Sequence, residues 1–222
     1  MEFLTGVKEK ETIGIREILS GDYVGKTVKM NGAVHNIRDM GEFAFIILRK
    51  AEGLVQCVYE EGKTEFDLKD LKEESAVEVT GVIALEERAP QGFELRLTGI
   101  RVLSEPAETM PIAINKWKMN TSLETRLSLR PVSLRNVRER AKFKIQEGIV
   151  RGFREFLSSQ GFTEVHTPKI VSRGAEGGAN VFKLNYFNKK AELGQSPQFY
   201  KQMMVGVFDR VFEVAPVFRA EK

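Results

Sequence analysis

Arg219 and Glu221 stand two positions apart in a segment of alternating hydrophobicity, residues 210–221. Successive side chains of a β-strand point to opposite faces, so these two would project from the same face. A guanidinium fork binds a carboxylate or a phosphate through paired hydrogen bonds, and an adjacent carboxylate can help to place such a ligand. Taken by itself, an Arg and a Glu at this spacing on a strand are usually a surface ion pair, and an anion-binding site is the alternative.

The chain has two histidines, His35 and His166, far apart in the sequence, and neither adjoins an obvious nucleophile. Catalysis by a His–Ser or His–Cys pair is therefore not indicated. The single cysteine, Cys57, excludes an intramolecular disulfide and fits a reducing compartment. The first residues lack the pattern of a signal peptide, and no apolar run approaches the ~18 residues of a membrane span. We therefore expect a cytoplasmic protein without a membrane partner.

The length of 222 residues suits one large domain or two small ones. With 42% hydrophobic and 29% charged residues, the chain can bury a core and is neither disordered nor fibrous. The net charge of +3 hides an asymmetry, because residues 1–105 carry 14 basic and 20 acidic side chains, whereas residues 106–222 carry 20 and 11. The basic half suits an anionic ligand such as a nucleotide or a nucleic acid.

Alternating segments between residues 27 and 103 predict a small β-barrel. The predicted strands are residues 27–37, 43–48, 54–59, 76–85 and 93–103. Helical spacing over residues 66–71 lies between the third and fourth strands. This order matches a five-stranded barrel of the oligonucleotide-binding (OB) type, although another small β-barrel fits the pattern about as well.

The rest of the chain predicts a mixed unit, so the fold class is α+β. Residues 106–133 form a predicted connector, because prolines punctuate it and no apolar period persists. Apolar residues at spacings of three and four then predict a long helix over 134–160, which Gly161 would end. Further predicted elements are strands over 163–171, 181–186 and 210–221 and a helix over 196–205.

Three segments resemble, in order, motifs of class II aminoacyl-tRNA synthetases. Residues 161–168, Gly-Phe-Thr-Glu-Val-His-Thr-Pro, resemble motif 1. Residues 210–221, Arg-Val-Phe-Glu-Val-Ala-Pro-Val-Phe-Arg-Ala-Glu, resemble the first strand of motif 2. Between them, residues 195–202, Gln-Ser-Pro-Gln-Phe-Tyr-Lys-Gln, resemble the amino-acid recognition segment of aspartyl-tRNA synthetases, in subclass b. With the predicted N-terminal barrel, the resemblance covers nearly the whole chain.

The resemblance implies three parts: an OB-fold anticodon-binding domain over residues 1–105, a connector or hinge over 106–133, and the N-terminal part of a class II antiparallel-sheet catalytic domain over 134–222. Motif 3 and the acidic metal ligands near it have no counterpart here, so the chain would be the N-terminal half of such an enzyme. A homodimer is also implied, through the helix over 134–160 and through Pro168 at the end of motif 1.

The implied activity is that of an aspartate–tRNA ligase, which activates L-aspartate with ATP and transfers it to tRNA(Asp), and in some members also to tRNA(Asn). Neither step needs an enzyme nucleophile, because both depend on positioning and charge neutralisation. Mg²⁺ is expected with ATP through ligands outside this chain, and no metal ligand is assigned within it. Two alternatives remain: an asparagine or lysine ligase of the same subclass, and a non-catalytic tRNA-binding fragment or paralogue.

By resemblance, Arg219 is the catalytic arginine that bridges the α-phosphate of ATP and the substrate carboxylate, and Glu221 helps to bind ATP. Lys201 would hold the side-chain carboxylate of aspartate, since a cationic pocket prefers a carboxylate to an amide. Glu176 lies in a Gly-rich loop that could move as a lid. Three residues would contact the amino end of aspartate: Glu176, Ser196 and Gln198.

In the barrel, aromatic faces can stack unpaired bases and amides can read base edges. The residues that resemble the family's anticodon-binding positions are His35, Arg38, Phe45, Gln56 and Pro90. Phe43 and Phe45 share one strand face, so we expect at least one of them in the core. His35 and Pro90 resemble the non-discriminating members that also charge tRNA(Asn), whereas Ala33 stands where the family usually has tryptophan.

Overall fold

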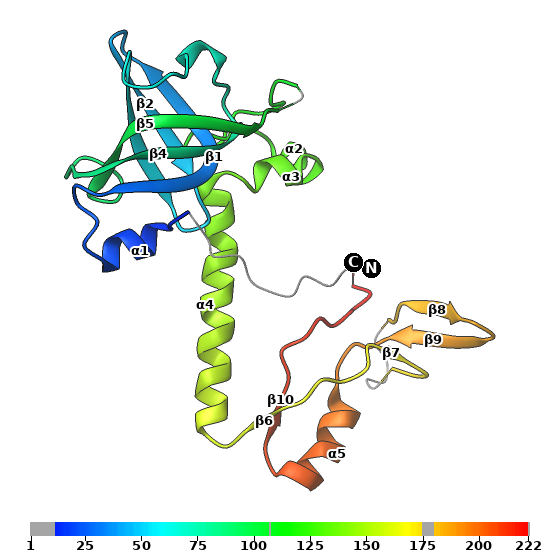
Figure 1. Ribbon diagram of the computed structural model, residues 1–222. Coiled ribbons are helices and arrows are strands. Elements are labelled where there is room, and N and C mark those ends of the chain that lie inside the picture. Colours follow the sequence, from blue (N-terminus) through cyan, green and yellow to red (C-terminus); the bar gives the residue numbers. More distant parts are fainter. Residues whose placement is uncertain (1–11, 107, 175–179, 222) are drawn as a thin grey trace, which may run out of the picture. The chain divides into compact units, whose positions relative to one another are not determined.

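The computed structural model describes residues 12–106, 108–174 and 180–221, which form two compact units, residues 1–140 and 141–222 (Figure 1). In the first unit a closed barrel has the strand order β1-β2-β3-β5-β4. Its elements are α1 (Ile15–Ser20), β1 (Thr27–Asp39), β2 (Phe43–Arg49), β3 (Leu54–Glu60), the 3₁₀ helix η1 (Leu68–Asp70), β4 (Ala76–Leu85) and β5 (Phe93–Ser104). The five predicted strands are confirmed, and the predicted helix over 66–71 is the shorter η1. The helix α1, before the barrel, was not expected.

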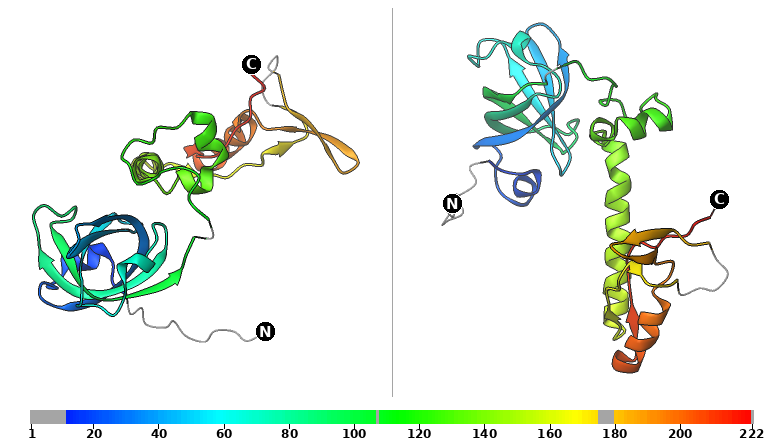
Figure 2. Two further views of the ribbon diagram at one scale, coloured as in Figure 1. Left: turned by 90° about the horizontal axis from the view of Figure 1, so that it is seen from above. Right: turned by 90° about the vertical axis from the view of Figure 1, so that its right-hand side faces the viewer.

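The barrel, drawn in the left view of Figure 2, has an interior made mostly by every second residue of its strands. The fully enclosed side chains include Met30, Val34, Ile46, Leu48, Val55, Val79, Ile83 and Leu95. Cys57 belongs to the same core, and burial raises the pKa of its thiol, which keeps it protonated and chemically inert. This closed interior directs the alternate residues of each strand to the outside of the barrel.

Gly81 marks the closest approach of β4 to β5. The pairing of these strands is interrupted by a bulge between Thr80 and Gly81, and a Cβ on Gly81 would lie 2.4 Å from the backbone oxygen of Arg96. We predict that Gly81→Ala destabilises the barrel by about 1–3 kcal/mol, because the added methyl group forces the strands apart. The measurement is the melting temperature. Gly99→Ala is the matched control, since its Cβ would have its nearest neighbour at 3.9 Å, and equal melting temperatures for the two variants would contradict the prediction.

The connector holds two short helices, α2 (Leu123–Ser128) and α3 (Arg130–Ser133), and leads into α4 (Val137–Ser159). We expected the long helix to begin at residue 134. It begins later because Asn136 caps it: the Asn136 side-chain oxygen accepts hydrogen bonds from the backbone N–H groups of Arg138 and Glu139 at 3.0 and 3.1 Å. Gly161 ends it at a φ of 77°, as predicted. Among the residues that the structure describes, no helix combines the length and apolarity needed to cross a membrane.

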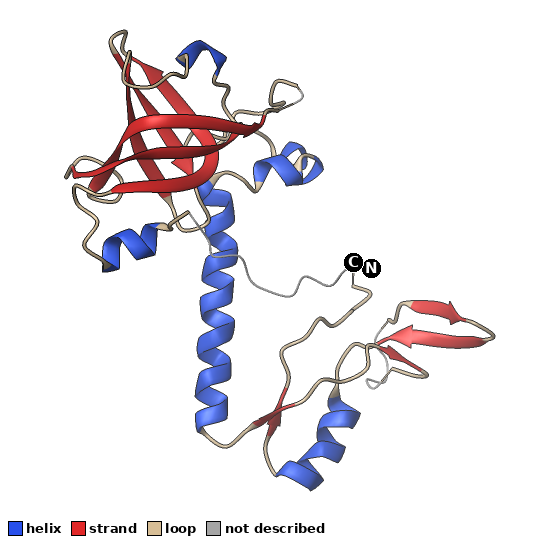
Figure 3. Cartoon of the chain, viewed as in Figure 1, coloured by secondary structure: helices blue, strands red, loops and turns tan. Residues whose placement is uncertain are grey.

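After α4, the described part of the second unit contains two small sheets and the helix α5 (Figure 3). The first sheet pairs β6 (Thr163–Glu164) with β10 (Val211–Phe212) in parallel, and the second has the order β7 (Ile170–Val171), β9 (Lys189–Leu193), β8 (Lys183–Tyr186). The helix α5 (Gln198–Phe208) starts two residues later than expected. The predicted strand over 163–171 is split into β6 and β7, and β9 was missed.

The predicted strand over 210–221 is wrong beyond its first residues. Only Val211 and Phe212 pair as a strand, because β6, their partner, is itself only two residues long. The chain then continues without regular structure to Glu221, held by two backbone hydrogen bonds, from Phe218 N–H to Gly194 O at 3.0 Å and from Ala220 N–H to Asn180 O at 3.4 Å. These bonds place the last described residues beside the segment that enters α5.

Candidate functional site

The outer face of the barrel brings three of the predicted anticodon-binding residues together. Arg38 in β1 lies opposite Phe45 in β2, and Phe45 lies opposite Val58 in β3. In the next row, Ile47 lies opposite Gln56, and Gln56 lies opposite Glu94 in β5. Directly paired residues of neighbouring strands project from the same face. Arg38, Phe45 and Gln56 therefore form one outward surface, with a cation, an aromatic ring and an amide.

The two phenylalanines of this surface are not in the core, so our expectation that at least one would be buried is wrong. Ala44 and Ile46 fill the interior positions of β2, while Phe43 is 39% exposed and Phe45 is half-buried. Their rings meet edge to face, with centroids 5.4 Å apart and an interplanar angle of 85°. An aromatic pair held on the outside of a barrel is a suitable platform for stacking unpaired bases.

Pro90 is exposed in the turn between β4 and β5. This turn lies beside the turn between β2 and β3, because a Cβ on Gly53 would come within 2.8 Å of Gln91 Nε2. The β2–β3 turn also leads directly into the strand that carries Gln56. Pro90 is thus at the end of the barrel nearest to Gln56, whose Nε2 donates to Glu94 Oε2 at 3.2 Å.

His35 lies in a buried polar cluster and is only 5% exposed. It occupies the bulge of β1 between Val34 and Asn36, and its Nδ1 lies 3.2 Å from Arg49 Nη1. Burial, and then the positive charge of Arg49, lower the pKa of His35, so the ring is neutral near pH 7. Sequence reasoning placed His35 at the rim, but it lines a cavity of about 240 Å³ instead.

Sequence reasoning missed the ion pair that surrounds His35. Arg49 donates to both carboxylate oxygens of Glu74 at 2.6 and 2.8 Å, and Arg135 donates to Glu74 Oε2 at 3.0 Å. The Arg49 and Glu74 side chains are 8% and 3% exposed. Burial alone would raise the pKa of Glu74, but the hydrogen bonds and charges of the two arginines overcome it and lower the pKa. Glu74 is therefore an anion fixed between two guanidinium groups.

In the second unit, a cavity of about 380 Å³ lies at the start of α5. Of the predicted aspartate-binding residues that the structure describes, Ser196 alone lines it; the other lining residues are Val171, Ser172, Arg173, Gly194, Phe199, Tyr200 and Met203. Gln198 is exposed as the first residue of α5, and Lys201 follows one turn later, half-buried and without an ionic partner among the described residues. Glu176 lies outside the described residues.

Backbone hydrogen bonds connect the segment that carries Arg219 and Glu221 to the segment that lines this cavity. Arg219 is flanked by Phe218, whose backbone N–H donates to Gly194 O, and by Ala220, whose backbone N–H donates to Asn180 O. Gly194 lies two residues before Ser196 in the sequence and lines the same cavity. Its guanidinium lies 3.7 Å from the Glu221 carboxylate, with side chains 53% and 73% exposed. Both groups face solvent, where an anionic ligand could reach the guanidinium.

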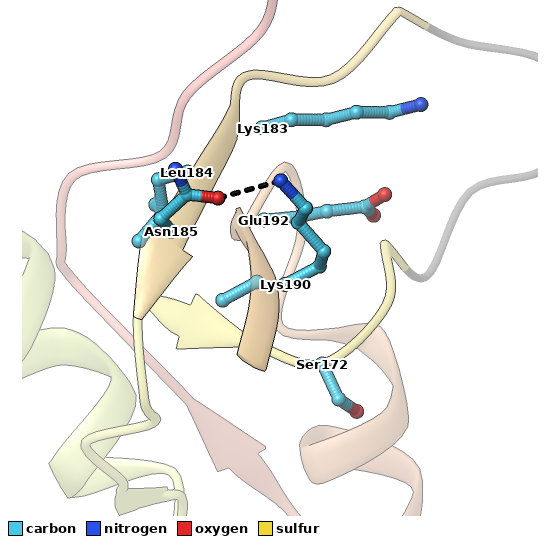
Figure 4. Close-up of a pocket in the computed structure, with 7 residues that line it drawn as sticks. Ser172, Lys183, Leu184, Asn185, Lys190 and Glu192 are labelled. Carbon is cyan, nitrogen blue, oxygen red and sulfur yellow. Dashed lines mark hydrogen bonds between the residues drawn. The ribbon is translucent and has the colours of Figure 1, made fainter. Parts of the chain in front are cut away.

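A second pocket, of about 530 Å³, contains none of the predicted site residues. Figure 4 shows Lys183, Asn185, Lys190 and Glu192 on one face of the β8–β9 hairpin, with Ser172 across from them. Lys190 Nζ donates to Asn185 Oδ1 at 2.7 Å, and Glu192 accepts from Gly174 N–H at 2.6 Å. Sequence reasoning missed this pocket because it did not predict β9.

Pro168, the predicted dimer-interface residue, is exposed. Its two neighbours in the sequence, Thr167 and Lys169, both donate hydrogen bonds to the buried carboxylate of Glu213. Thr167 donates to Glu213 from its backbone N–H at 2.7 Å, and Lys169 Nζ donates to Glu213 Oε1 at 2.8 Å. The Glu213 side chain is 3% exposed. Burial alone would raise its pKa, but the hydrogen bonds from Lys169 and Thr167 overcome this and lower it. The Pro168 segment is thereby fixed to the segment that carries Arg219.

Glu213→Gln is expected to destabilise the second unit by about 1–3 kcal/mol at pH 7, because the amide cannot replace a carboxylate that accepts from an ammonium. A carboxylate with a lowered folded pKa stabilises the fold above its unfolded pKa of about 4.3, and this contribution is lost as the pH falls through the lower folded value. The difference between wild type and variant should therefore shrink in acid.

The measurement is hydrogen exchange of the α5 and β9 amides at pH 7 and at lower pH. Glu155→Gln is the matched control, since Glu155 is 71% exposed in its pair with Arg151. If Glu213→Gln and Glu155→Gln gave equal exchange rates at pH 7, the Glu213 contacts would not stabilise the unit.

Within residues 12–106, 108–174 and 180–221, no three His, Cys, Asp or Glu side chains gather closely enough to hold a metal ion. The carboxylates of Glu74 and Glu213 are already occupied by cationic side chains.

Comparison with known proteins matches both units. Residues 122–222 match the family described as tRNA synthetases class II (D, K and N), and residues 28–103 match the OB-fold nucleic acid binding domain. Among solved structures, asparaginyl-tRNA synthetase from Pyrococcus horikoshii, complexed with asparaginyl-adenylate, is similar with a TM-score of 0.81 and 33% identity, over 90% of this chain and 46% of that one.

Two curated relatives are similar over most of this chain. The aspartate–tRNA(Asp/Asn) ligase of Deinococcus radiodurans is 48% identical over 198 residues, 89% of this chain and 44% of the relative. The aspartate–tRNA(Asp/Asn) ligase of Thermus thermophilus is 44% identical over 200 residues, 90% of this chain and 46% of the relative. The chain thus spans about half the length of the curated relatives it matches.

Proposed function

We propose that this chain belongs to an aspartate–tRNA ligase, because residues 122–222 match the class II tRNA synthetases (D, K and N) and residues 28–103 match the OB-fold nucleic acid binding domain. It would carry the anticodon-binding domain and part of the machinery that activates aspartate. The observation that carries the proposal is its identity of 44–48% to ligases named for aspartate and for both tRNA(Asp) and tRNA(Asn).

The barrel is proposed to bind the anticodon of tRNA(Asp). Phe45 would stack an unpaired base, Gln56 would read a base edge, and Arg38 would neutralise a nearby phosphate. The pairing of β1, β2 and β3 supports this, because it gathers the three side chains on one outward face. His35 and Pro90 are the remaining proposed anticodon residues, and they are the basis for extending the tRNA range to tRNA(Asn).

The second unit is proposed to bind ATP and L-aspartate. Arg219 would bridge the α-phosphate and the attacking carboxylate, and Glu221 would help to bind ATP. Lys201 would take the side-chain carboxylate of aspartate, which disfavours asparagine and lysine as substrates. Ser196, Gln198 and Glu176 would contact the amino end of aspartate. Mg²⁺ would be bound with ATP by groups outside this chain.

The proposed domain limits are residues 1–105 for the barrel, 106–133 for the connector and 134–222 for the catalytic part, in a cytoplasmic enzyme. A homodimer is proposed through α4 and Pro168. Support comes from the apolar side chains of α4 that no described residue covers: Ile145, Ile149, Phe153 and Phe156 are 64%, 67%, 48% and 63% exposed. Ile149→Asp is expected to convert a dimer to a monomer in sedimentation-velocity experiments, whereas Lys144→Asp, on the charged side of the helix, should not.

The activity is tested by aminoacylation with the whole gene product and with the 222-residue chain. We expect the whole gene product to charge tRNA(Asp) with aspartate, and to charge tRNA(Asn) with aspartate as well. Charging with asparagine or lysine in place of aspartate would identify the rival ligases. If the 222-residue chain binds tRNA but charges nothing, while the whole product is also inactive, the non-catalytic tRNA-binding alternative holds.

A further inference from the structure

Gln195 makes none of the proposed substrate contacts, yet it is a polar residue that is only 2% exposed. We infer that Gln195 is a positioning residue, which holds the backbone beside Arg219 against the segment that enters α5. This inference rests on the proposed function, because Gln195 would act only through the contacts of Arg219 with ATP and aspartate.

The residue before Arg219 is held by a backbone contact. Phe218 donates from its backbone N–H to Gly194 O at 3.0 Å, and the backbone N–H of Gly194 donates to Lys169 O at 2.8 Å. Lys169 is in turn bound to the buried carboxylate of Glu213. Gly194, the neighbour of Gln195, therefore connects the Phe218 backbone to a fixed part of the second unit.

The residue after Arg219 is held through the side chain of Gln195. Ala220 donates from its backbone N–H to Asn180 O at 3.4 Å, and Gln195 Nε2 donates to the same oxygen at 2.8 Å. A backbone carbonyl has two lone pairs and can accept both hydrogen bonds. Because the contact with Ala220 is long, it depends on the position of the Asn180 carbonyl, which the shorter bond from Gln195 sets.

The surroundings of Gln195 favour one orientation of its amide. Its Oε1 is buried and has no hydrogen-bond partner among the described residues. A Cβ on Gly174 would lie 3.3 Å from this oxygen, so the Gly174 backbone packs against that side of the amide. Turning the amide over would place Oε1 against Asn180 O, where neither atom can donate. A buried acceptor without a partner lowers stability, so stability alone does not account for an amide at this position.

The backbone on either side of Arg219 matters because the proposed chemistry depends on positioning. Displacing a group by about 1 Å can lower the rate of such a reaction up to about a hundredfold. The Arg219 side chain is 53% exposed, so packing restrains it only in part. The anchors at Phe218 and Ala220 then define where the guanidinium can reach.

Hydrogen exchange of single amides tests the anchor in the 222-residue chain without any substrate. In Gln195→Met, which keeps the length but loses the donor, we expect the Ala220 N–H to exchange at least about fivefold faster than in wild type. The Phe218 N–H, which donates to a backbone carbonyl, should change by less than about twofold. Gln160→Met, at an exposed position, is the matched control and should leave both rates unchanged. Equal Ala220 rates in Gln195→Met and wild type would overturn the inference.

A second variant decides the question if Gln195→Met also releases the amides of α5. In Gln195→Glu, a protonated carboxyl can donate to Asn180 O, whereas a carboxylate cannot. We therefore expect the protection of the Ala220 N–H, relative to that of Phe218, to be present in acid and lost as the pH rises. Relative protection that is the same at both pH values would overturn the inference.

ATP–pyrophosphate exchange by the whole gene product tests whether Gln195 acts through Arg219. We expect Gln195→Met to lower kcat/KM for aspartate about tenfold in the wild-type background and less than about twofold in Arg219→Ala, where the positioned group is gone. General damage to the fold would lower the rate by the same factor in both backgrounds, and that result would overturn the inference. If the wild-type product activates no aspartate, the proposed function fails, while hydrogen exchange still decides whether Gln195 anchors Ala220.

Discussion

Replacing Arg219 with alanine is expected to lower the rate of aspartate-dependent ATP–pyrophosphate exchange by the whole gene product at least about a hundredfold. The reaction brings a carboxylate against a phosphate, and negative charge builds up between them. A guanidinium that bridges both groups stabilises this charge more than it stabilises the separate substrates, so its removal lowers the turnover number as well as the affinity. A ligand can reach Arg219 because its side chain is 53% exposed.

Arg101→Ala is the matched control for Arg219, since Arg101 is also an exposed arginine paired with a glutamate, at 3.0 Å from Glu78 in the barrel. Its exchange rate should stay within about twofold of wild type, because exposed ion pairs contribute little. If Arg219→Ala retained the wild-type exchange rate, the assignment of Arg219 as the catalytic arginine would be wrong.

Replacing Arg49 with methionine is expected to destabilise the barrel by about 3–5 kcal/mol, the cost of leaving a buried charge without its partner. Glu74 would remain with its side chain 3% exposed, held by Arg135 alone. Methionine has a similar length, so the loss reflects charge and hydrogen bonding more than volume. The measurement is urea unfolding at pH 7, followed by the fluorescence of Trp117.

Two further variants show whether the loss of stability in Arg49→Met comes from the buried charge. Arg101→Met breaks the exposed pair with Glu78 and should cost less than about 1 kcal/mol. The double change Arg49→Met with Glu74→Leu removes both buried charges and should recover part of the stability, because an apolar pair can replace a buried ion pair. A single Arg49→Met variant as stable as Arg101→Met would show that the buried pair contributes nothing.

The barrel was predictable because its signal is local. Each strand alternates apolar and polar residues, and a core residue such as Ile46 is flanked by outward residues whose side chains the same alternation exposes. The same pattern could not separate Phe43 and Phe45 from the core, because an aromatic residue on a strand is compatible with either face. Only the register of β2 against β1 and β3 places Phe45 beside Arg38 and Gln56.

Contacts between distant residues were not predictable. Arg49 ends a strand whose alternation assigns it to the surface, and its burial depends on Glu74 and Arg135, which lie 25 and 86 positions further along. His35 was expected at the rim for the same reason. No periodic pattern in a single sequence reports an ion pair across such separations.

The prediction of a strand near the end of the chain was wrong for a related reason. Residues 213–221 alternate like a strand, but alternation describes only how side chains would face if a partner strand were present. Among the described residues, β6 supplies a partner for Val211 and Phe212 alone. The motif residues Arg219 and Glu221 were still identifiable, because the type and order of residues in 210–221 carried the resemblance independently of strand pairing.

The choice of amino acid is the central claim, and amino-acid-dependent ATP–pyrophosphate exchange by the whole gene product tests it most directly. Aspartate, asparagine and lysine are each supplied with ATP and labelled pyrophosphate. We predict exchange with aspartate and none above background with the other two, because the Lys201 ammonium attracts a carboxylate, offers no acceptor for an amide and repels a lysine side chain. Exchange with asparagine or lysine and none with aspartate would contradict the account.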